Sequence, residues 1–475
     1  MLRDGNFRLF WTGQTISLIG GQVSLVALPL LAVLTLDAGS FEVGLLAALG
    51  RAPWLLFGLL AGALADRVRR RPLLIGADLV RAAALAWIPA AAALGVLTME
   101  QLYAVTFVVG SMTVVSDVAA QSFLPSLAAP AQLADGNSKL EISRASAEAV
   151  GPGLGGVLVQ AVTASFAIVA DVVSFLLSAV LLGRVKVDER TVRAGAGAMT
   201  GSGAGTGAGT GSEAGARAGA GSVAGEVREG MRFVLGHPLL RWNVLAAAVA
   251  NFFGNILLAI LVLYILREIG LAPAMIGLVL GLGSLGAVLG AAVAQRLIRR
   301  IGFGPTLTAG LATTAVGGLL LAAVDGPYAL RVAWAVAAMM LLLAGVPLFD
   351  VAVVTLRQLI TPPRLLGRAN ATMRFLVFGT MPLGALAGGL LGEHAGLRTA
   401  VLVAGAGLAG PVVIVLVSPL SRLRSHLPPS ETRLPTPGAH PPPAEAHPTR
   451  PGAPPAPDGA SSEPLSDITT SGGTP

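Results

Sequence analysis

The sequence predicts an all-α membrane protein with twelve transmembrane helices arranged in two six-helix halves. Hydrophobic residues make up 54% of the 475 residues and charged residues only 12%, whereas a soluble protein carries about 25% charged residues. Apolar runs of about 20 residues, long enough to cross the hydrocarbon core of a bilayer, separate the charged clusters. A third observation, an internal repeat, divides these runs into two related sets.

The apolar runs also predict the topology. We expect spans at residues 11–36, 42–65, 73–96, 101–123, 139–160, 165–184, 240–266, 274–295, 305–324, 329–356, 368–391 and 399–420. Arginines gather in the loops after spans two, eight and ten, whereas the opposite loops hold only Arg267, Arg331 and Arg398. Because cytoplasmic loops are enriched in Lys and Arg, we expect both termini in the cytoplasm of a bacterial cell, with the chain in its cytoplasmic membrane.

Composition predicts four regions. Residues 1–185 and 239–425 form the two six-helix halves. Residues 186–238 contain a Gly- and Ala-rich stretch without apolar periodicity, typical of a flexible cytoplasmic linker, followed by a short segment that predicts an amphipathic helix. Residues 426–475 are rich in Pro, Ala, Ser and Gly, a composition typical of a disordered tail.

The two halves repeat one another at a spacing of 233 positions. In this frame, matching residue types occur at Asp117 and Asp350, Pro130 and Pro363, Leu133 and Leu366, Asn137 and Asn370, Gly151 and Gly384, Gly155 and Gly388, and Gly156 and Gly389. Parallel repeats of six spans are typical of transporters whose halves rock around a central site. The repeat therefore favours transport.

The stretch "GPGLGG" at 151–156 has a second interpretation. It fits the G-x-G-x-x-G pattern of a dinucleotide-binding turn, with Asp171 twenty residues after Gly151. That pattern requires a preceding strand and a βαβ unit, but these glycines lie within an apolar span. A degenerate copy at 384–389 also lies within a span. Close packing of membrane helices explains the glycines better.

The loop "GALADRVRRRP" at 62–72 joins the second and third spans. It resembles the G-x-x-x-D-R-x-G-R-R loop of the major facilitator superfamily, with matches at Gly62, Asp66, Arg67, Arg70 and Arg71 and with Arg69 in place of the usual glycine. The resemblance implies the major facilitator fold and a gating latch. In that latch Asp66 faces a helix N-terminus of the other half and the arginines bridge to an acid on span four, here Asp117.

Other stretches resemble the macrolide-efflux and enterobactin-exporter branch of that superfamily, over roughly residues 5 to 425. The motif G-P-x-x-G-G, here Gly151, Pro152, Gly155 and Gly156, also resembles the antiporter motif of its exporters. A proline removes a helical hydrogen bond, and glycines permit helices to slide against each other. Ordinary packing of small residues is the alternative explanation for this motif.

Charged residues inside the spans are costly and usually functional. A proton carrier must be a carboxylate in a partly dry site, so we expect Glu148 or Asp171 to couple transport to protons. Arg144 lies one turn before Glu148, which leaves a structural pair as the alternative. The other expected cavity or pairing charges are Arg51, Asp350 and Arg374, of which Asp350 and Arg374 lie at similar depth and could pair.

These observations predict proton-coupled efflux of a small amphipathic compound by alternating access. The alternatives are a nutrient uptake permease and a membrane sensor or assembly factor that does not transport. The chain has no cysteine, no clustered histidines, no G-x-x-x-x-G-K-[ST] motif and no catalytic constellation, so we expect neither an enzyme, nor a metal site, nor a cofactor. The expected partners are the substrate, protons and the lipid bilayer, without nucleic acid, and the resemblance implies a monomer.

Overall fold

The computed structural model of the chain describes residues 4–67, 69–127, 132–186, 223–361 and 365–423. Within these ranges the side chains of residues 58–67, 134, 223–227, 366–368 and 371 are not described. The predicted tail and most of the predicted linker lie outside the described residues. Every regular element in the described part of the chain is helical, which confirms the predicted fold class.

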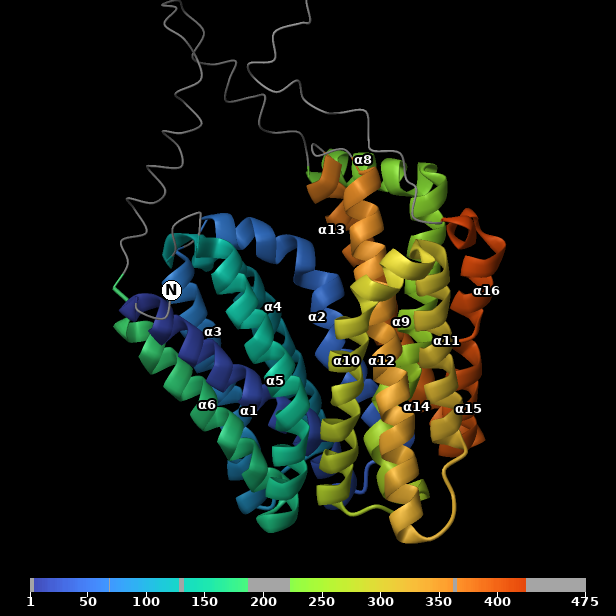
Figure 1. Cartoon of the computed structure of the whole chain (residues 1–475). Helices are drawn as coiled ribbons and strands as arrows, with labels where there is room; N and C mark the ends of the chain where they lie inside the picture. The colour runs from blue at the N-terminus through green and yellow to red at the C-terminus, as the bar shows by residue number, and fades with distance from the viewer. Residues whose placement is uncertain (1–3, 68, 128–131, 187–222, 362–364, 424–475) are drawn as a thin grey trace, which may run out of the picture. The chain divides into compact units, whose positions relative to one another are not determined.

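Six long helices precede the linker and form the N-terminal bundle. They are α1 (Gly5–Thr35), α2 (Ser40–Arg67), α3 (Arg70–Ala93), α4 (Met99–Leu127), α5 (Leu133–Ala161) and α6 (Ala164–Arg184). In Figure 1, α1 and α6 run beside each other, and α6 also packs on α3. Short loops join consecutive helices, so neighbours in the sequence run in opposite directions.

The C-terminal bundle repeats this pattern with more interruptions. Its elements are α9 (Pro238–Leu263), the π-helix η2 (Tyr264–Glu268), α10 (Pro273–Ile301), α11 (Phe303–Ala322), α12 (Tyr328–Ile360), α13 (Leu366–Phe378), α14 (Thr380–Ala395), α15 (Leu397–Gly407), α16 (Gly410–Val417) and the 3₁₀ helix η4 (Pro419–Arg422). Pairs of elements, such as α13 with α14, form single spans that are interrupted at one or two residues. The bundle therefore corresponds to the second set of six predicted spans.

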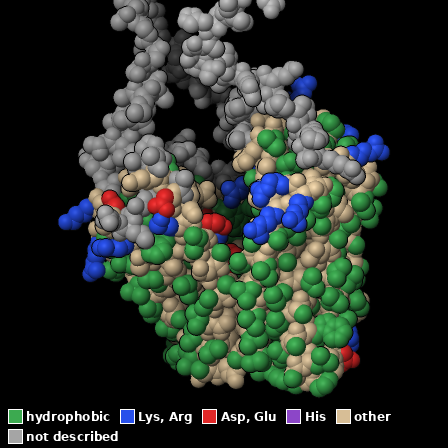
Figure 2. Space-filling view, in the orientation of Figure 1, with side chains coloured by type: hydrophobic (Ala, Val, Ile, Leu, Met, Phe, Trp, Pro, Cys, Tyr) green, Lys and Arg blue, Asp and Glu red, His purple; other side chains and the backbone are tan. Residues whose placement is uncertain are grey.

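Eleven helical segments of the described chain are long and apolar enough to cross a membrane. The remaining predicted span is α5, which has 29 residues but carries five charged residues between Leu133 and Glu148. Hydrophobic side chains cover most of the described surface in Figure 2, and many basic side chains gather near one end. Such a surface requires lipid rather than water around it, so the described chain is a multi-pass membrane protein.

The predicted amphipathic helix is α8 (Val223–Gly236). Val234 is fully buried in a small cluster that includes Leu240 of α9 and Met373 of α13, whereas Arg228 and Arg232 are exposed. In Figure 1, α8 lies beside α13 at one end of the bundle. One face of α8 is therefore packed against the C-terminal bundle and the other carries charge.

The two ends of the molecule can be named from the chain itself. At the terminal end, α1 begins and α6 ends, and the Asn6 side chain exchanges hydrogen bonds with the backbone of Lys186. The far end contains the connection between α1 and α2 and the connection between η2, which continues α9, and α10. The largest hydrophobic core contains residues of α1 and α9 as well as of several neighbouring helices.

Candidate functional site: a polar cavity closed at the far end

Glycines bring α5 of the N-terminal bundle against α10 of the C-terminal bundle at the far end. A β-carbon added to Gly156 would lie 2.5 Å from the carbonyl oxygen of Pro273 and 2.9 Å from Cα of Gly277. Just beyond this contact, the backbone N–H of Ala274 donates a hydrogen bond of 3.0 Å to Oε1 of Gln160. This N–H belongs to the first turn of α10, where backbone donors lack intrahelical acceptors. Gln160 therefore supplies a cap across the two bundles.

A second contact joins α2 to α14 in the same way. A β-carbon added to Gly44 would lie 2.5 Å from Cα of Gly389. Oε2 of Glu393 accepts hydrogen bonds from the backbone N–H groups of Ser40 at 3.1 Å and Phe41 at 3.4 Å. The carboxylate thus lies at the N-terminus of α2, where a negative charge is favoured. The far end is closed by both contacts together.

The cavity begins where this closure ends. It has a volume of about 790 Å³ and is lined mainly by α9, α12 and α13, with Arg51 of α2 contributed by the other bundle. Its charged lining residues are Arg51, Asp350, Arg357 and Arg374. Asp350 and Arg374 are exposed although each lies within an apolar span, because the cavity admits solvent to them. Figure 2 shows the surface hollowed between the bundles, with acidic and basic side chains beside the hollow.

No ion pair within 4.0 Å joins the arginines of the cavity to a described carboxylate. Arg374 lies over the rings of Trp54 and Phe378, with 5.6 Å to each ring centroid. Arg51 donates to the carbonyl oxygen of Ala47 at 3.1 Å. The predicted proximity of Asp350 and Arg374 produces no ion pair: both line the cavity, but no ion pair within 4.0 Å joins them in the described structure.

Sequence reasoning missed two polar contributions to this cavity. Arg357 follows predicted span ten and was counted only among the arginines of the next loop, but it lines the cavity and donates to Sδ of Met373 at 3.4 Å. Asparagines of α9, among them Asn243, Asn251 and Asn255, also line it. Their spacing of four or eight residues places them on one helical face, and that pattern in an apolar span was the available signal.

The two carboxylates predicted to carry protons do not line this cavity. Glu148 is exposed on α5, and its predicted neighbour Arg144 instead lies 3.8 Å from Oε2 of Glu141. Asp171 is 1% exposed between α1 and α6. Its Oδ2 accepts a hydrogen bond from Ser24 and its Oδ1 accepts one from Ser174 at 3.0 Å. No ion pair to Asp171 occurs within the described chain.

A buried ion pair lies elsewhere in the interior of the N-terminal bundle. Asp78 and Arg81 on α3 are 1% and 6% exposed and form a salt bridge. Arg81 also donates to Oγ of Ser116 on α4 at 3.1 Å and lies 4.2 Å above the ring of Phe175 on α6. The pair therefore ties three helices together. Nε of Arg81 has no hydrogen-bond partner among the described residues.

The structure describes only part of the predicted latch. The side chains of Gly62, Asp66 and Arg67 are outside it. Arg71 donates through Nε to the carbonyl oxygen of Leu182 at 2.9 Å and also to that of Gly183. A cation is favoured at the C-terminus of a helix, here α6 of the same bundle. Arg70 is half-buried at the start of α3.

Asp117, the predicted latch partner, lies on α4 and is partly exposed. The guanidinium groups of Arg144, Arg81 and Arg374 act on it through their charge. Arg374 belongs to the C-terminal bundle, so Asp117 is under the electrostatic influence of both bundles.

The antiporter-like motif is a packing surface in this structure. Gly155 faces α1, where an added β-carbon would lie 3.1 Å from Cα of Val23, and Gly151 faces Gln22 of the same helix. Gly156 and the carbonyl of Pro152 face α10 instead. Its small residues thus allow α5 to approach one helix of its own bundle and one of the other.

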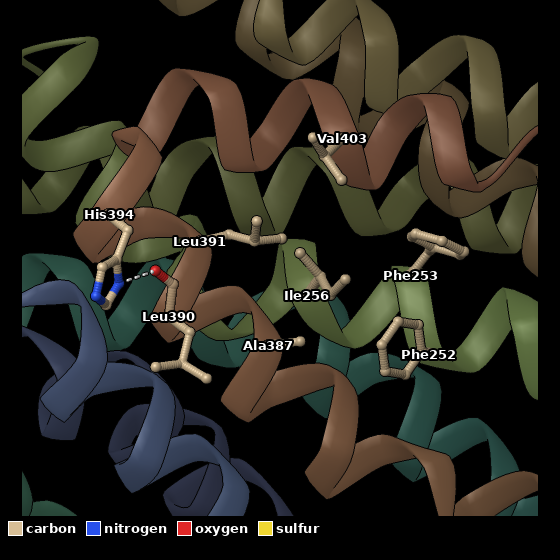
Figure 3. Close-up of a pocket in the computed structure, with 8 residues that line it drawn as sticks. All are labelled: Phe252, Phe253, Ile256, Ala387, Leu390, Leu391, His394 and Val403. Atoms are coloured by element: carbon tan, nitrogen blue, oxygen red, sulfur yellow. Dashed lines mark hydrogen bonds between the residues drawn. The ribbon is translucent and has the colours of Figure 1, made fainter.

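A separate groove lies between α9, α14 and α15 and is drawn in Figure 3. It has a volume of about 580 Å³, and seven of its eight lining residues are apolar. His394 is at one end, with Nδ1 2.9 Å from the carbonyl oxygen of Leu390. The groove lacks the charged side chains of the central cavity, so it is the weaker candidate for a polar substrate.

Two helical bundles that meet at one end, with a polar cavity beyond their contact, are typical of membrane transporters. Comparison with known families gives the same assignment. The family described as "Transmembrane secretion effector" matches residues 1–202, and the family described as "Major Facilitator Superfamily" matches residues 244–457. The chain belongs to the major facilitator superfamily.

Relatives agree with this assignment. An uncharacterized MFS-type transporter of Bacillus subtilis, YfiS, is 26% identical over 399 residues, which cover 82% of this chain and 88% of the relative. A bacterial homologue of the iron transporter ferroportin, solved in an inward-facing state, is 18% identical with a TM-score of 0.64, covering 88% of this chain and 98% of that one. A D-xylose–proton symporter is 13% identical with a TM-score of 0.62, covering 87% and 96%. The solved structures show the shared fold.

Proposed function

We propose that this protein exports a small amphipathic compound from a bacterial cell by alternating access, coupled to proton entry. The observation that carries the proposal is the closure of the far end by two glycine contacts while a polar cavity lies between that closure and the terminal end. Substrate then enters from the terminal side, and separation of α5 from α10 and of α2 from α14 releases it at the far side.

Charge distribution supports a cytoplasmic terminal end. Basic residues occur there at the junction of α2 and α3 and in the last turn of α10, where Arg299 and Arg300 lie. The far end carries Arg267, Arg331 and Arg398. This imbalance follows the positive-inside rule, so the cavity faces the cytoplasm and both termini are cytoplasmic.

Asp171 is the better of the two proposed proton carriers. It is buried between α1 and α6, and its polar partners are hydroxyl groups rather than cations. A buried carboxylate without an ion-pair partner is favoured in its neutral form. Glu148 is exposed on α5, where water stabilises its charge. Because Asp171 lies apart from the cavity, coupling would act through helix packing rather than through direct competition with substrate.

Accumulation of fluorescent dyes of both charges in an efflux-deficient bacterial host tests the proposal. Cells carrying the protein should accumulate less of at least one dye than cells with empty vector, and a protonophore should remove the difference. Asp171→Asn should weaken export, whereas Glu141→Gln, a change at an exposed carboxylate, should leave it unaltered. Higher accumulation would instead establish uptake, as in the symporter that shares the fold.

A locked variant distinguishes a transporter from a sensor that does not transport. The chain has no cysteine, so Ser40→Cys with Gly392→Cys introduces a single pair. A β-carbon at position 392 would lie 2.9 Å from Cβ of Ser40, and disulfides require about 3.5–4.5 Å, so a small displacement suffices. Oxidation should stop dye movement and reduction should restore it. Dye movement that survives complete cross-linking would exclude alternating access at this closure.

A further inference from the structure

The central cavity has an excess of positive charge. Three guanidinium groups, those of Arg51, Arg357 and Arg374, line it together with a single described carboxylate, that of Asp350. They come from α2, α12 and α13, so they are distributed around the cavity rather than along one helix. In a site with low-dielectric walls, such an excess attracts and concentrates ligands of the opposite sign.

Hydrogen-bond donors in the cavity wall also lack acceptors. Nε of Arg357 and Nδ2 of Asn243 are buried and have no hydrogen-bond partner among the described residues. Oδ1 of Asn370, an acceptor, is unpartnered as well. A buried donor without an acceptor is destabilising, and more so when it is charged. A ligand with acceptor oxygens would satisfy the two donors, whereas a cationic ligand would not.

The aromatic contacts of Arg374 leave its charge unneutralised. Its guanidinium group lies over Trp54 and Phe378, whose rings meet edge to face at 6.2 Å. A cation–π contact attracts the cation but adds no negative charge. The guanidinium group of Arg374 occupies the position over these rings that an organic cation would need for the same contact. The planar edge of Arg374 remains suited to a carboxylate or phosphate group.

The acidic groups near the cavity do not reverse this balance. Asp350 lies two turns before Arg357 on α12 and is exposed to the cavity. Asp117 is influenced by Arg374 but does not line the cavity. The lining thus keeps two more positive than negative formal charges. The remaining wall includes apolar residues such as Leu257, Leu342 and Phe349.

We propose that this cavity binds an amphipathic organic anion. A carboxylate or phosphate group lies against Arg51, Arg357 and Arg374, and an apolar body lies along α9 and α12. The assignment deepens the proposed function, because it presumes that the cavity is the transport site. The membrane potential of an inside-negative cell also favours the exit of an anion.

Matched probes of opposite charge test the assignment by binding rather than by transport. Fluorescein and rhodamine 123 share a xanthene ring but carry negative and positive charge, and octyl phosphate and octyltrimethylammonium form a second pair. Anisotropy of the dyes and thermal unfolding with the octyl compounds would be measured on the full chain in lipid nanodiscs. The anion of each pair should bind more tightly.

Substitutions identify the groups responsible. Arg357→Gln and Arg374→Gln should each weaken anion binding by ~10-fold or more, as loss of a charged hydrogen-bonding partner does, and Arg357→Lys should recover part of it. Asp350→Asn should strengthen anion binding. An unfolding temperature close to that of the unaltered chain would show that each variant is folded.

Tighter binding of either cation, stronger anion binding after Arg357→Gln, or no binding of either anion would overturn the assignment. Failure of the accumulation assay together with intact anion binding would instead count against the proposed transport alone. The two proposals can therefore fail separately.

Discussion

Gln160 and Glu393, which are 233 positions apart, each accept a hydrogen bond from the first turn of a helix in the opposite bundle. Their donors, the N–H groups of Ala274 and Phe41, are separated by the same 233 positions. The adjacent glycine contacts follow the same relation, since Gly156 with Gly277 corresponds to Gly389 with Gly44. The internal repeat therefore relates the two halves of the far-end closure to each other.

Adding a methyl group at the closure should open the far end. In Gly156→Ala the new β-carbon meets the backbone of Pro273 and Gly277, and overpacking of this kind costs about 1–3 kcal/mol. The state with the far end separated loses this clash, so its population rises. A reporter Ser40→Cys, 7% exposed in the parent residue, should then react faster with a membrane-impermeant maleimide added from the far side.

Gly76→Ala provides the matched control for that experiment, because a β-carbon at Gly76 meets nothing within 4 Å. It should leave the labelling rate of the reporter unchanged. Equal labelling rates in Gly156→Ala and Gly76→Ala would show that the glycine contact does not hold the far end closed.

Removing the carboxylate of Glu393, which accepts these hydrogen bonds, should also favour opening of the far end. Glu393→Ala leaves the N–H groups of Ser40 and Phe41 without their cap, and loss of an N-terminal cap costs about 0.5–2 kcal/mol. Glu393→Gln keeps an acceptor oxygen and should have a smaller effect. Distances between spin labels placed on α2 and α14 would report the shift, and an unchanged distance distribution in Glu393→Ala would count against the cap.

The buried pair on α3 should be a stability element. Arg81→Met leaves the Asp78 carboxylate buried without its partner, and breaking a buried pair in this way costs about 3–5 kcal/mol. The double change Asp78→Leu with Arg81→Met removes both charges and should recover much of the loss. Thermal unfolding in detergent compares the variants. A single change that leaves the unfolding temperature unaltered would exclude this role.

The junction of α8 and α9 should be sensitive to acid. Nδ1 of His237 accepts a hydrogen bond of 3.3 Å from the N–H of Leu239, which requires an unprotonated nitrogen. Burial lowers the pKa of His237 below its ordinary value. The unfolded junction therefore takes up a proton before the folded one, and the stability of the junction should fall as the pH decreases through about 6.5.

Hydrogen exchange of the amides around residues 233–241 measures this dependence. After correction for the intrinsic pH dependence of amide exchange, the exchange rate of these amides should rise as the pH is lowered from about 7 to about 5.5. His237→Asn, which supplies a capping oxygen that does not titrate, should remove the additional acceleration. The same acceleration in His237→Asn would place the sensitive group elsewhere.

The helices and their pairing were predictable because hydrocarbon imposes a strong constraint on sequence. A span needs about 20 apolar residues and must satisfy its own backbone, so the apolar runs predicted twelve spans, among them 139–160, which corresponds to α5. Glycines at fixed spacing likewise predicted close helix contacts. The pairing of Arg144 could not be predicted from the sequence, because Glu141, Arg144 and Glu148 share one face of α5. In the structure Arg144 lies closer to Glu141 than to Glu148.

The sequence by itself determined that this chain is a helical membrane protein with repeated halves, since apolar length, arginine bias and the 233-position match can all be read from the order of residues without knowing their contacts. Only the tertiary structure decided which charges meet in one place. Arg51 lies on a helix of the other half, far from Arg357 and Arg374 in the sequence, and packing brings all three to one cavity while Asp171 is buried outside it. A charge inside a span is a costly exception wherever it occurs, and its neighbours across the bundle determine what it can do.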